Sequence, residues 1–155
     1  MPTVYRIVKT KYAKTAFDGE GAFRYGGRWN TRGTRLIYTA GSLSLAALEM
    51  LVHLDDDELL WSYSFVAAQI PPHLILPVRA FRSLPKHWNA SPSPVALQQI
   101  GDAWVRANAS AVLEVPTSIV PLESNYLINP AHPDYPQITL EKPRRFVFDE
   151  RLRKG

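Results

Sequence analysis

The sequence predicts an α+β fold, a single domain in which a mixed or predominantly antiparallel β-sheet is flanked by helices. Runs of β-branched and aromatic residues, typical of strands, are spread along the chain, whereas only two segments have helical spacing. A length of 155 residues suits one domain, and no internal repeat divides it. Because 46% of the residues are hydrophobic and 21% are charged, the chain can bury a core and is not mainly disordered.

Two strands are predicted in the N-terminal part of the chain, at Thr3–Lys9 and at Arg35–Thr39. Side chains alternate between the two faces of a strand, so Arg6 shares a face with Val4 and Val8. A guanidinium stays charged in proteins, and among apolar neighbours it is unfavourable unless it meets an anion or lines a pocket. Arg6 is therefore a candidate functional residue.

A helix is predicted over Leu43–Leu54, with Ser42 or Ser44 as its N-cap. At helical spacing Glu49 lies on the flank of an apolar stripe, and His53 lies one turn further along. We expect the Glu49 carboxylate to be partly buried. The stripe consists of Leu45, Leu48 and Val52.

The acidic run Asp55–Glu58 is interpreted as a solvated helix exit. A long, half-buried strand follows over Leu59–Ile70, because Trp61, Tyr63 and Phe65 alternate with serines. The second helix begins at Ser93-Pro94 and continues to Asn108. Shorter strands are predicted at Leu74–Leu76, Ala111–Val115, Ile119-Val120 and Arg145–Phe148.

Several classes of site are excluded by what the sequence lacks. Without cysteine there is no thiolate nucleophile, disulfide or cysteine-ligated metal. There is no glycine-rich dinucleotide motif, no P-loop and no serine-hydrolase elbow. We expect no bound metal, because no metal-ligand spacing connects the four histidines, His53, His73, His87 and His132.

The charge and the distribution of apolar residues indicate the kind of ligand and the expected location of the protein. Eighteen Lys and Arg against fourteen Asp and Glu give a net charge of +4, which fits an anionic ligand. No apolar stretch approaches the roughly 20 residues that span a bilayer, so no membrane partner is expected. The N-terminus has no signal-peptide pattern, and we expect a cytoplasmic location.

Polar residues in apolar surroundings suggest one pocket. Arg6 and Arg28 suit phosphates or a carboxylate, Tyr38 offers an aromatic surface, and Glu49 supplies a carboxylate. A hydroxyl pair, Thr117-Ser118, lies next to a predicted strand. Together these side chains indicate a site for an anionic ligand that carries a flat ring.

A family resemblance accompanies this pattern. It is carried by Tyr5-Arg6, Gly26-Gly27-Arg28-Trp29-Asn30, Tyr38-Thr39-Ala40, Leu45-Ala46-Ala47-Leu48-Glu49 with His53, Val115-Pro116-Thr117-Ser118, Asn125-Tyr126-Leu127-Ile128-Asn129-Pro130 and His132-Pro133. With these blocks the chain resembles the RES domain, the toxin of bacterial Xre–RES toxin–antitoxin modules. The resemblance covers about residues 4–148 of a single domain of residues 1–155, with 149–155 as a basic tail.

The resemblance implies a fold similar to that of toxin-type ADP-ribosyltransferases, and NAD as the substrate. Matched block by block, it implies that Glu49, Arg28, Tyr38 and His53 are catalytic. It also implies that the residues that bind NAD are Arg6, Arg28, Trp29, Asn30, Tyr38, Thr117 and Ser118. The serine of the family falls on Thr117, so either Thr117 or the adjacent Ser118 takes its role.

The chemistry of NAD cleavage suits these residues. Breaking the nicotinamide–ribose bond develops positive charge on the ribose, which the Glu49 carboxylate would stabilise in the transition state. Arg6 and Arg28 would bind the pyrophosphate, and Tyr38 would stack on the nicotinamide ring. A role for His53 is left open.

Three functions are compatible with these sequence features. The first is an NAD-consuming toxin that hydrolyses or phosphorolyses its substrate, inhibited by a cognate Xre-family antitoxin. The second is a mono-ADP-ribosyltransferase with a host protein as acceptor; Ala47, where protein-modifying enzymes often carry an acid or amide, slightly disfavours it. The third is a basic nucleic-acid-binding or RNase-like toxin. We also expect a homodimer, with DNA contacted only through the antitoxin.

Overall fold

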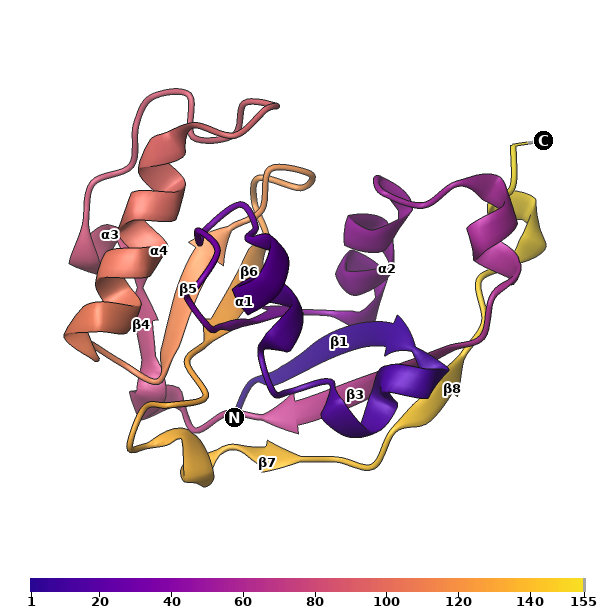
Figure 1. Ribbon diagram of the computed structural model, residues 1–155, viewed down its shortest axis with the longest axis horizontal. Helices are drawn as coiled ribbons and strands as arrows, with labels where there is room; N and C mark the ends of the chain where they lie inside the picture. The colour runs from indigo at the N-terminus through magenta and orange to yellow at the C-terminus, as the bar shows by residue number, and fades with distance from the viewer. Residues whose placement is uncertain (155) are drawn as a thin grey trace.

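The computed structural model describes residues 1–154, whose strands form one mixed, curled β-sheet with helices packed against it (Figure 1). The predicted α+β class is confirmed. The sheet has eight strands in the order β4-β5-β6-β2-β1-β3-β7, and β8 also pairs with β3. The strands are β1 (Thr3–Lys9), β2 (Ile37–Ala40), β3 (Tyr63–Gln69), β4 (Ile75–Pro77), β5 (Val112–Pro116), β6 (Ser124–Ile128), β7 (Thr139–Leu140) and β8 (Arg144–Phe146).

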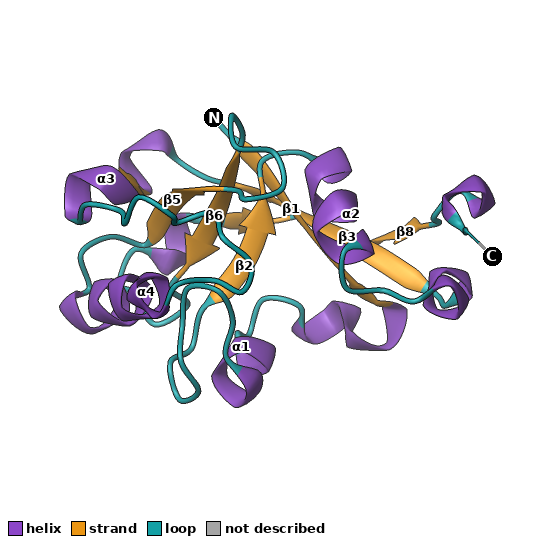
Figure 2. Ribbon diagram, turned by 90° about the horizontal axis from the view of Figure 1, so that it is seen from above, coloured by secondary structure: helices purple, strands orange, loops and turns teal. Residues whose placement is uncertain are grey.

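Helices cover the sheet at both ends. Viewed from above, α2 lies beside β1 and β3, whereas α4 lies at the other end of the molecule (Figure 2). The α-helices are α1 (Glu20–Tyr25), α2 (Leu43–Leu51), α3 (Val78–Phe81) and α4 (Val95–Ala107). The 3₁₀ helices are η1 (Thr10–Thr15), η2 (Asp56–Leu60), η3 (Pro72–Leu74), η4 (Tyr135–Gln137) and η5 (Glu150–Leu152).

The sheet divides where β1 meets β2. Those two strands pair only at Tyr5 and Ala40, whereas β1 pairs with β3 along its whole length from Thr3 to Lys9. Beyond the single pair, β1 and β2 separate, and the two parts of the sheet run in clearly different directions (Figure 1). Only β4 and β5 are parallel; the other pairs among the described strands are antiparallel. The separation opens space for a site in the middle of the sheet.

Helix α4 confirms the second predicted helix. Its amphipathic spacing buries Leu97, Ile100 and Trp104 against the β5–β6 end of the sheet. The chain leaves the helix at Asn108, whose φ of 47° is left-handed, a conformation that asparagine tolerates better than most residues.

Helix α2 is shorter and rotated relative to its prediction. It ends at Leu51, and of the predicted stripe only Leu45 is fully buried, because Leu48 is 41% and Val52 is 59% exposed. The buried face instead carries Leu45 and Ala46. This rotation turns Glu49 toward the sheet.

Two of the predicted strands need correction. The strand predicted at Leu59–Ile70 begins only at Tyr63, because Asp56–Leu60 form a 3₁₀ helix capped by a hydrogen bond from the Asp55 amide to the Glu58 carboxylate. Residues 63–68 are all buried rather than alternately exposed, since β3 lies inside the sheet with packing on both faces. The strand predicted at Ile119-Val120 is a turn.

The strand that replaces it is β6, in the middle of the sheet. Its first residues, Ser124 and Asn125, are polar, and only the following Tyr126, Leu127 and Ile128 have the composition of a strand. Helix α1 was also not predicted, because Gly21 and the glycines after Tyr25 resemble a loop. Within residues 1–154, no helix has the length and apolar character needed to cross a membrane.

Candidate active site

A cleft of about 1130 Å³ opens where β1 and β2 separate. Its walls come from β1, α1 and the glycine loop that follows it (residues 26–30), β2, α2, the segment before α4, the turn after β5 and the start of β6. Most of the polar residues expected from the sequence line it, namely Arg6, Arg28, Tyr38, Glu49, His53 and Ser118. Segments distant in sequence therefore form one site.

Glu49 projects from α2 and is held by two donors from outside its helix. The Thr117 hydroxyl donates to Glu49 Oε1 at 2.6 Å, and the Asn125 side-chain amide donates to the same oxygen at 2.8 Å. Both bonds are short, as expected for an ionised acceptor. Since these are the side-chain hydrogen bonds that Glu49 makes among residues 1–154, Oε2 is left for the cleft.

The two adjacent hydroxyls, those of Thr117 and Ser118, have different contacts. Thr117 is 1% exposed; besides donating to Glu49, its oxygen accepts the amide N–H of Ile119 at 3.2 Å. Ser118 does not reach Glu49 but lines the cleft. Thr117 thus positions the carboxylate, while Ser118 is placed to meet a ligand.

Arg6 lies at the point where the sheet divides. Its Nε donates to the Ala16 carbonyl at 2.8 Å, and Nη1 donates to the Tyr38 carbonyl at 3.2 Å. Burial lowers the pKa of the Arg6 guanidinium, although the nearby Asp18 carboxylate acts in the opposite direction. Arg6 therefore joins the two parts of the sheet and also lines the cleft, and Nη2 takes no part in these two hydrogen bonds.

Arg28 anchors the opposite wall. Its Nη2 donates to the carbonyls of Trp88 and Ala90, at 2.6 and 3.0 Å, which fixes the segment before α4. Burial lowers the pKa of Arg28, and the charge of Glu49 partly counteracts this. Arg28 Nε is buried without a partner among the described residues. The guanidinium thus both shapes the cleft and places a positive charge near Glu49.

Tyr38 presents its ring to the cleft while its hydroxyl is used inside the protein. The hydroxyl accepts the Trp29 amide N–H at 2.9 Å and donates to Asn30 Oδ1 at 2.7 Å. Burial raises the pKa of the Tyr38 phenol, so the hydroxyl stays protonated. The ring, rather than the hydroxyl, is the part available to a ligand.

The positions of Trp29 and Asn30 do not match their predicted contact with NAD. Trp29 is 3% exposed in the core beside α4, and the Asn30 side-chain amide donates to the carbonyl of Ala22 in α1 and to those of Thr31 and Thr34. Neither residue lines the cleft. They hold the glycine loop in shape, and direct contact with a ligand would require that loop to rearrange.

Helix α4 supports the same loop from behind. The Gln98 side chain donates to the carbonyls of Gly27 and Asn30, and the buried Asp102 carboxylate accepts from the amide and hydroxyl of Thr31. Because a side chain at Gly101 would overlap the Trp29 carbonyl, only glycine fits at this contact. The glycine loop that carries Arg28 is thus supported by α4.

His53 follows α2, is exposed and lines the cleft. Its side chain makes no hydrogen bond to Glu49 in the described structure, although the two residues lie four positions apart. His53 is therefore free to approach a ligand or a partner from the rim.

Some residues of the cleft were not singled out from the sequence. The most important is Asn125, which contacts Glu49 although it begins a strand that was not predicted. Asn89, Ser91 and Ser93 line the wall that Arg28 holds. Asn125 belongs to a block that carried the family resemblance, and this was the only signal for it; the wall residues had none.

Comparison with known proteins places this chain in a family. The RES domain model matches residues 3–149, nearly the whole chain. The chain belongs to the RES domain family. "Toxin Res" of Photorhabdus laumondii is 40% identical to this RES domain over 153 residues, which are 98% of this chain and 97% of that protein. The "Prs ADP-ribosylating toxin" of a Sphingobium species is 36% identical over 143 residues, 91% of this chain and 89% of its own.

The fold of the RES domain also matches a solved structure. The crystal structure of the Mycobacterium tuberculosis MbcT–MbcA toxin–antitoxin complex contains a chain that superposes with a TM-score of 0.77 at 19% identity, covering 94% of this chain and 84% of that one. At this identity the match supports the fold alone. It agrees with the curled mixed sheet described above.

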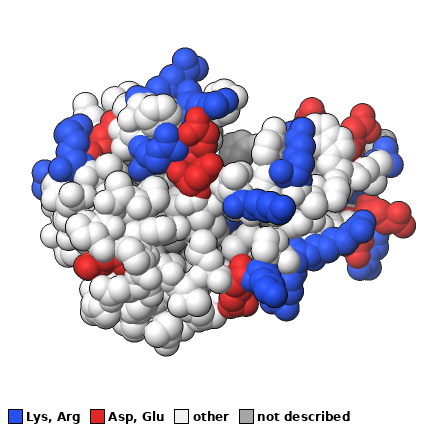
Figure 3. All heavy atoms as spheres, turned by 60° about the horizontal axis from the view of Figure 1, so that its bottom comes forward, with Lys and Arg blue, Asp and Glu red and all other residues white. Residues whose placement is uncertain are grey.

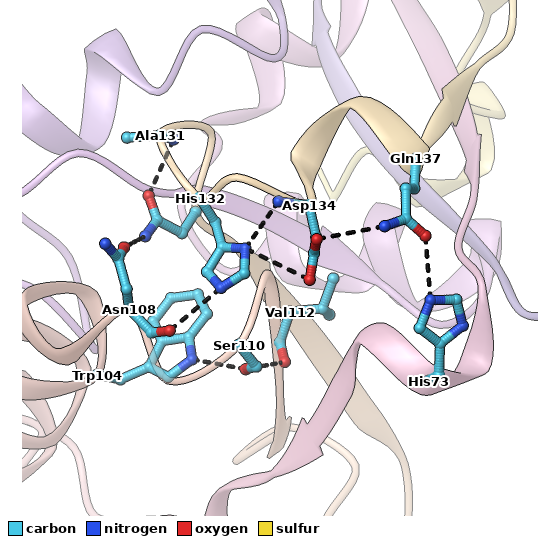
Figure 4. A network of polar contacts seen from close by, with 10 residues as sticks. His73, Trp104, Asn108, Ser110, Val112, Ala131, His132, Asp134 and Gln137 are labelled. Atoms are coloured by element: carbon cyan, nitrogen blue, oxygen red, sulfur yellow. Dashed lines mark hydrogen bonds and ion pairs between the residues drawn. The ribbon is translucent and has the colours of Figure 1, made fainter.

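One of the blocks that carried the resemblance is structural in this RES domain (Figure 4). The amide N–H of Asp134 donates to His132 Nδ1, so the ring proton lies on Nε2 and is donated to the Asn108 carbonyl at 3.1 Å. Asn129 bonds the Asn108 side chain and the Ala131 amide. These contacts tie the end of α4 to the exit of β6, away from the cleft.

Some of the surface arginines of the RES domain are paired with carboxylates. Glu20 bonds both Arg24 and Arg35, and near the C-terminus Arg151 pairs with Asp149. On the face seen in Figure 3, acidic and basic side chains lie next to each other beside a broad uncharged area. On this face the arrangement does not favour a continuous nucleic-acid groove.

Proposed function

We propose that this RES domain is the toxin of a toxin–antitoxin module and consumes NAD by cleaving the nicotinamide–ribose bond. The observation that carries the proposal is the Glu49 carboxylate, whose Oε1 is held from two sides while Oε2 is left for a cleft that is also lined by two partly buried arginines, Arg6 and Arg28. The relatives are named as toxins, which supports the proposed toxin function.

The reaction makes specific demands on the protein. The bond between the ribose C1′ and the pyridinium nitrogen breaks, and nicotinamide leaves as a neutral molecule with the electron pair. The ribose acquires oxocarbenium character, which an adjacent carboxylate stabilises more strongly in the transition state than in the substrate. Water or phosphate then adds to C1′ and releases a proton. Glu49 is the residue in the cleft with the required charge.

The arginines suit the other end of NAD. Arg6 Nη2 and the part of Arg28 not bonded to the cleft wall are available for the pyrophosphate, because guanidinium groups bind phosphate oxygens through paired N–H donors. The Tyr38 ring provides a surface for nicotinamide. Ser118 and Asn89 line the cleft as further polar contacts.

Incubation of the pure protein with NAD, with and without inorganic phosphate, tests the proposal. We expect nicotinamide together with ADP-ribose or its phosphorylated form, resolved by chromatography. Glu49→Gln keeps the acceptor oxygen for Thr117 but removes the charge, and we expect turnover to fall at least about 100-fold. Glu123→Gln, an exposed glutamate outside the cleft, serves as the matched control. Intact NAD after hours with the wild-type protein would overturn the proposal.

The Sphingobium relative is named for ADP-ribosylation, which makes transfer to a protein the second candidate reaction. Labelled NAD added to a cell extract distinguishes the two reactions. Label on a protein band, lost with Glu49→Gln, favours transfer, whereas label in free ADP-ribose favours degradation.

We also propose a cognate Xre-family antitoxin as the partner of this protein, reaching the cleft and blocking it. The solved structure of similar fold is a toxin–antitoxin complex, which supports such a partner. Co-expression with the neighbouring gene product should restore growth and abolish NAD turnover. Light scattering of the pure protein tests the expected homodimer, and DNA should bind only when the antitoxin is present.

A further inference from the structure

Asn125 is a polar residue in the interior of the sheet whose contacts serve Glu49. Its strand, β6, is paired on both sides, with Asn125 opposite Ala40 of β2 and Val115 of β5. The side-chain Nδ2 donates to Glu49 Oε1 at 2.8 Å, and part of the side chain lines the cleft. The backbone of this donor is thus held more rigidly than a loop residue would be.

The other end of the Asn125 amide is not satisfied. Its Oδ1 is buried and has no hydrogen-bond partner among residues 1–154. An ionised carboxylate only accepts hydrogen bonds, so the NH₂ group must face Glu49 and the amide cannot turn over to relieve its oxygen. A buried acceptor without a partner is unfavourable, and such groups are rare in folded proteins. Asn125 therefore holds the Glu49 carboxylate at a cost to stability, because its own oxygen is buried without a partner.

We infer that Asn125 is a positioning residue, which together with Thr117 locks Glu49 so that Oε2 faces the reacting atoms. The inference rests on the proposed function, in which Glu49 acts on the substrate. Thr117 follows β5 and Asn125 lies in β6, so the two donors approach the same oxygen from adjacent strands. Loss of either donor frees the carboxylate to rotate, and small misplacements of a catalytic group have large effects on rate.

The Asn125→Ala variant separates positioning from structure. We expect kcat for NAD to fall about 10- to 100-fold, while the Kd for NAD stays within about threefold of the wild type. We expect the Tm to stay the same or to rise, because the variant also removes the unsatisfied oxygen. A residue with a merely structural role would show the reverse, a lower Tm with kcat retained in the folded fraction, and that result would overturn the inference.

Two further variants sharpen the test. Asn125→Asp keeps the shape but places a carboxylate oxygen against Glu49, so kcat should fall at least as far as in Asn125→Ala. Tyr126→Phe, on the next residue of β6, should keep kcat and controls for disturbance of the strand.

A crystal structure of Asn125→Ala provides a measurement that does not depend on turnover. We expect the Glu49 carboxylate to be displaced or to occupy more than one rotamer; an unchanged carboxylate would overturn the inference even if the protein does not cleave NAD. If the wild type neither binds nor cleaves NAD, the proposed function fails. If the wild type cleaves NAD and Asn125→Ala does so equally well, only the inference about Asn125 fails.

Discussion

The Thr117 hydroxyl donates a 2.6 Å hydrogen bond to Glu49 Oε1, joining residues 68 positions apart in the chain. Thr117 is buried and has no contact with the cleft, so its effect on a ligand passes through Glu49. Ser118, one residue later, lines the cleft but does not contact Glu49. The contact tells the two hydroxyls apart, which the sequence could not.

Removal of the Thr117 hydroxyl should reduce turnover without unfolding the protein. Thr117→Val replaces the hydroxyl with a methyl group, so Glu49 loses one of its two donors, and we expect kcat to fall at least about tenfold. Thr117→Ser keeps the hydroxyl and should retain most activity. Ser118→Ala is the matched variant, expected to change the KM for NAD more than kcat. Equal kcat in Thr117→Val and the wild type would contradict this role.

Loss of the Tyr38 hydroxyl should weaken the fold more than the cleft. In Tyr38→Phe the Trp29 amide loses its acceptor and Asn30 Oδ1 its donor, which we expect to reduce the free energy of unfolding by about 1–3 kcal/mol. The ring remains, so the Kd for NAD should stay within about threefold. Tyr25→Phe, on an exposed tyrosine, should change stability by less than about 0.5 kcal/mol. Denaturant titration measures the free energy of unfolding, and titration calorimetry measures the Kd for NAD.

Substitution of Gly101 should disrupt the support that α4 gives to the glycine loop. An alanine side chain would overlap the Trp29 carbonyl, a backbone atom that cannot easily move aside, so Gly101→Ala should destabilise by about 3 kcal/mol or more. For a domain of this size we expect the Tm to fall by roughly 6–12 °C. Gly21→Ala, with open space around the new side chain, should cause no loss of stability. Similar Tm values for the two variants would show that the loop adapts.

The ion pairs of Glu20 should make a small, pH-dependent contribution to stability. Hydrogen bonds from Arg35 and Arg24 lower the pKa of Glu20 below its usual range. With the folded pKa below the unfolded one, the stabilisation is fully present above the unfolded pKa and is lost as the pH falls through the folded value.

Glu20→Gln should therefore lower the Tm slightly at neutral pH, and the difference from the wild type should vanish in acid. The effect should be small, because all three side chains are substantially exposed. Glu123→Gln serves as control, since its carboxylate forms none of the ion pairs among residues 1–154. A Tm difference that grows toward low pH would contradict the assignment.

The sequence alone determined the class of the fold and most of the cleft. Local patterns predicted β1, β2 and the helix over Val95–Ala107, because alternation and helical spacing report which side chains a segment must bury. The family resemblance, now confirmed, pointed to Arg6, Arg28, Tyr38 and Glu49, and these residues do line one cleft. A charged residue in an apolar row was a useful signal for Arg6.

The tertiary structure decided what each polar residue contacts. The local pattern predicts a strand at Ile119-Val120 and does not single out Asn125, because β6 begins with polar residues and its pairing with β2 and β5 is not visible in the local sequence. The packing of α2 turns Glu49, not Leu48, toward the sheet. Trp29 and Asn30 support the loop from within. Hydrogen bonds between distant segments depend on how strands are paired, and local sequence does not encode that pairing.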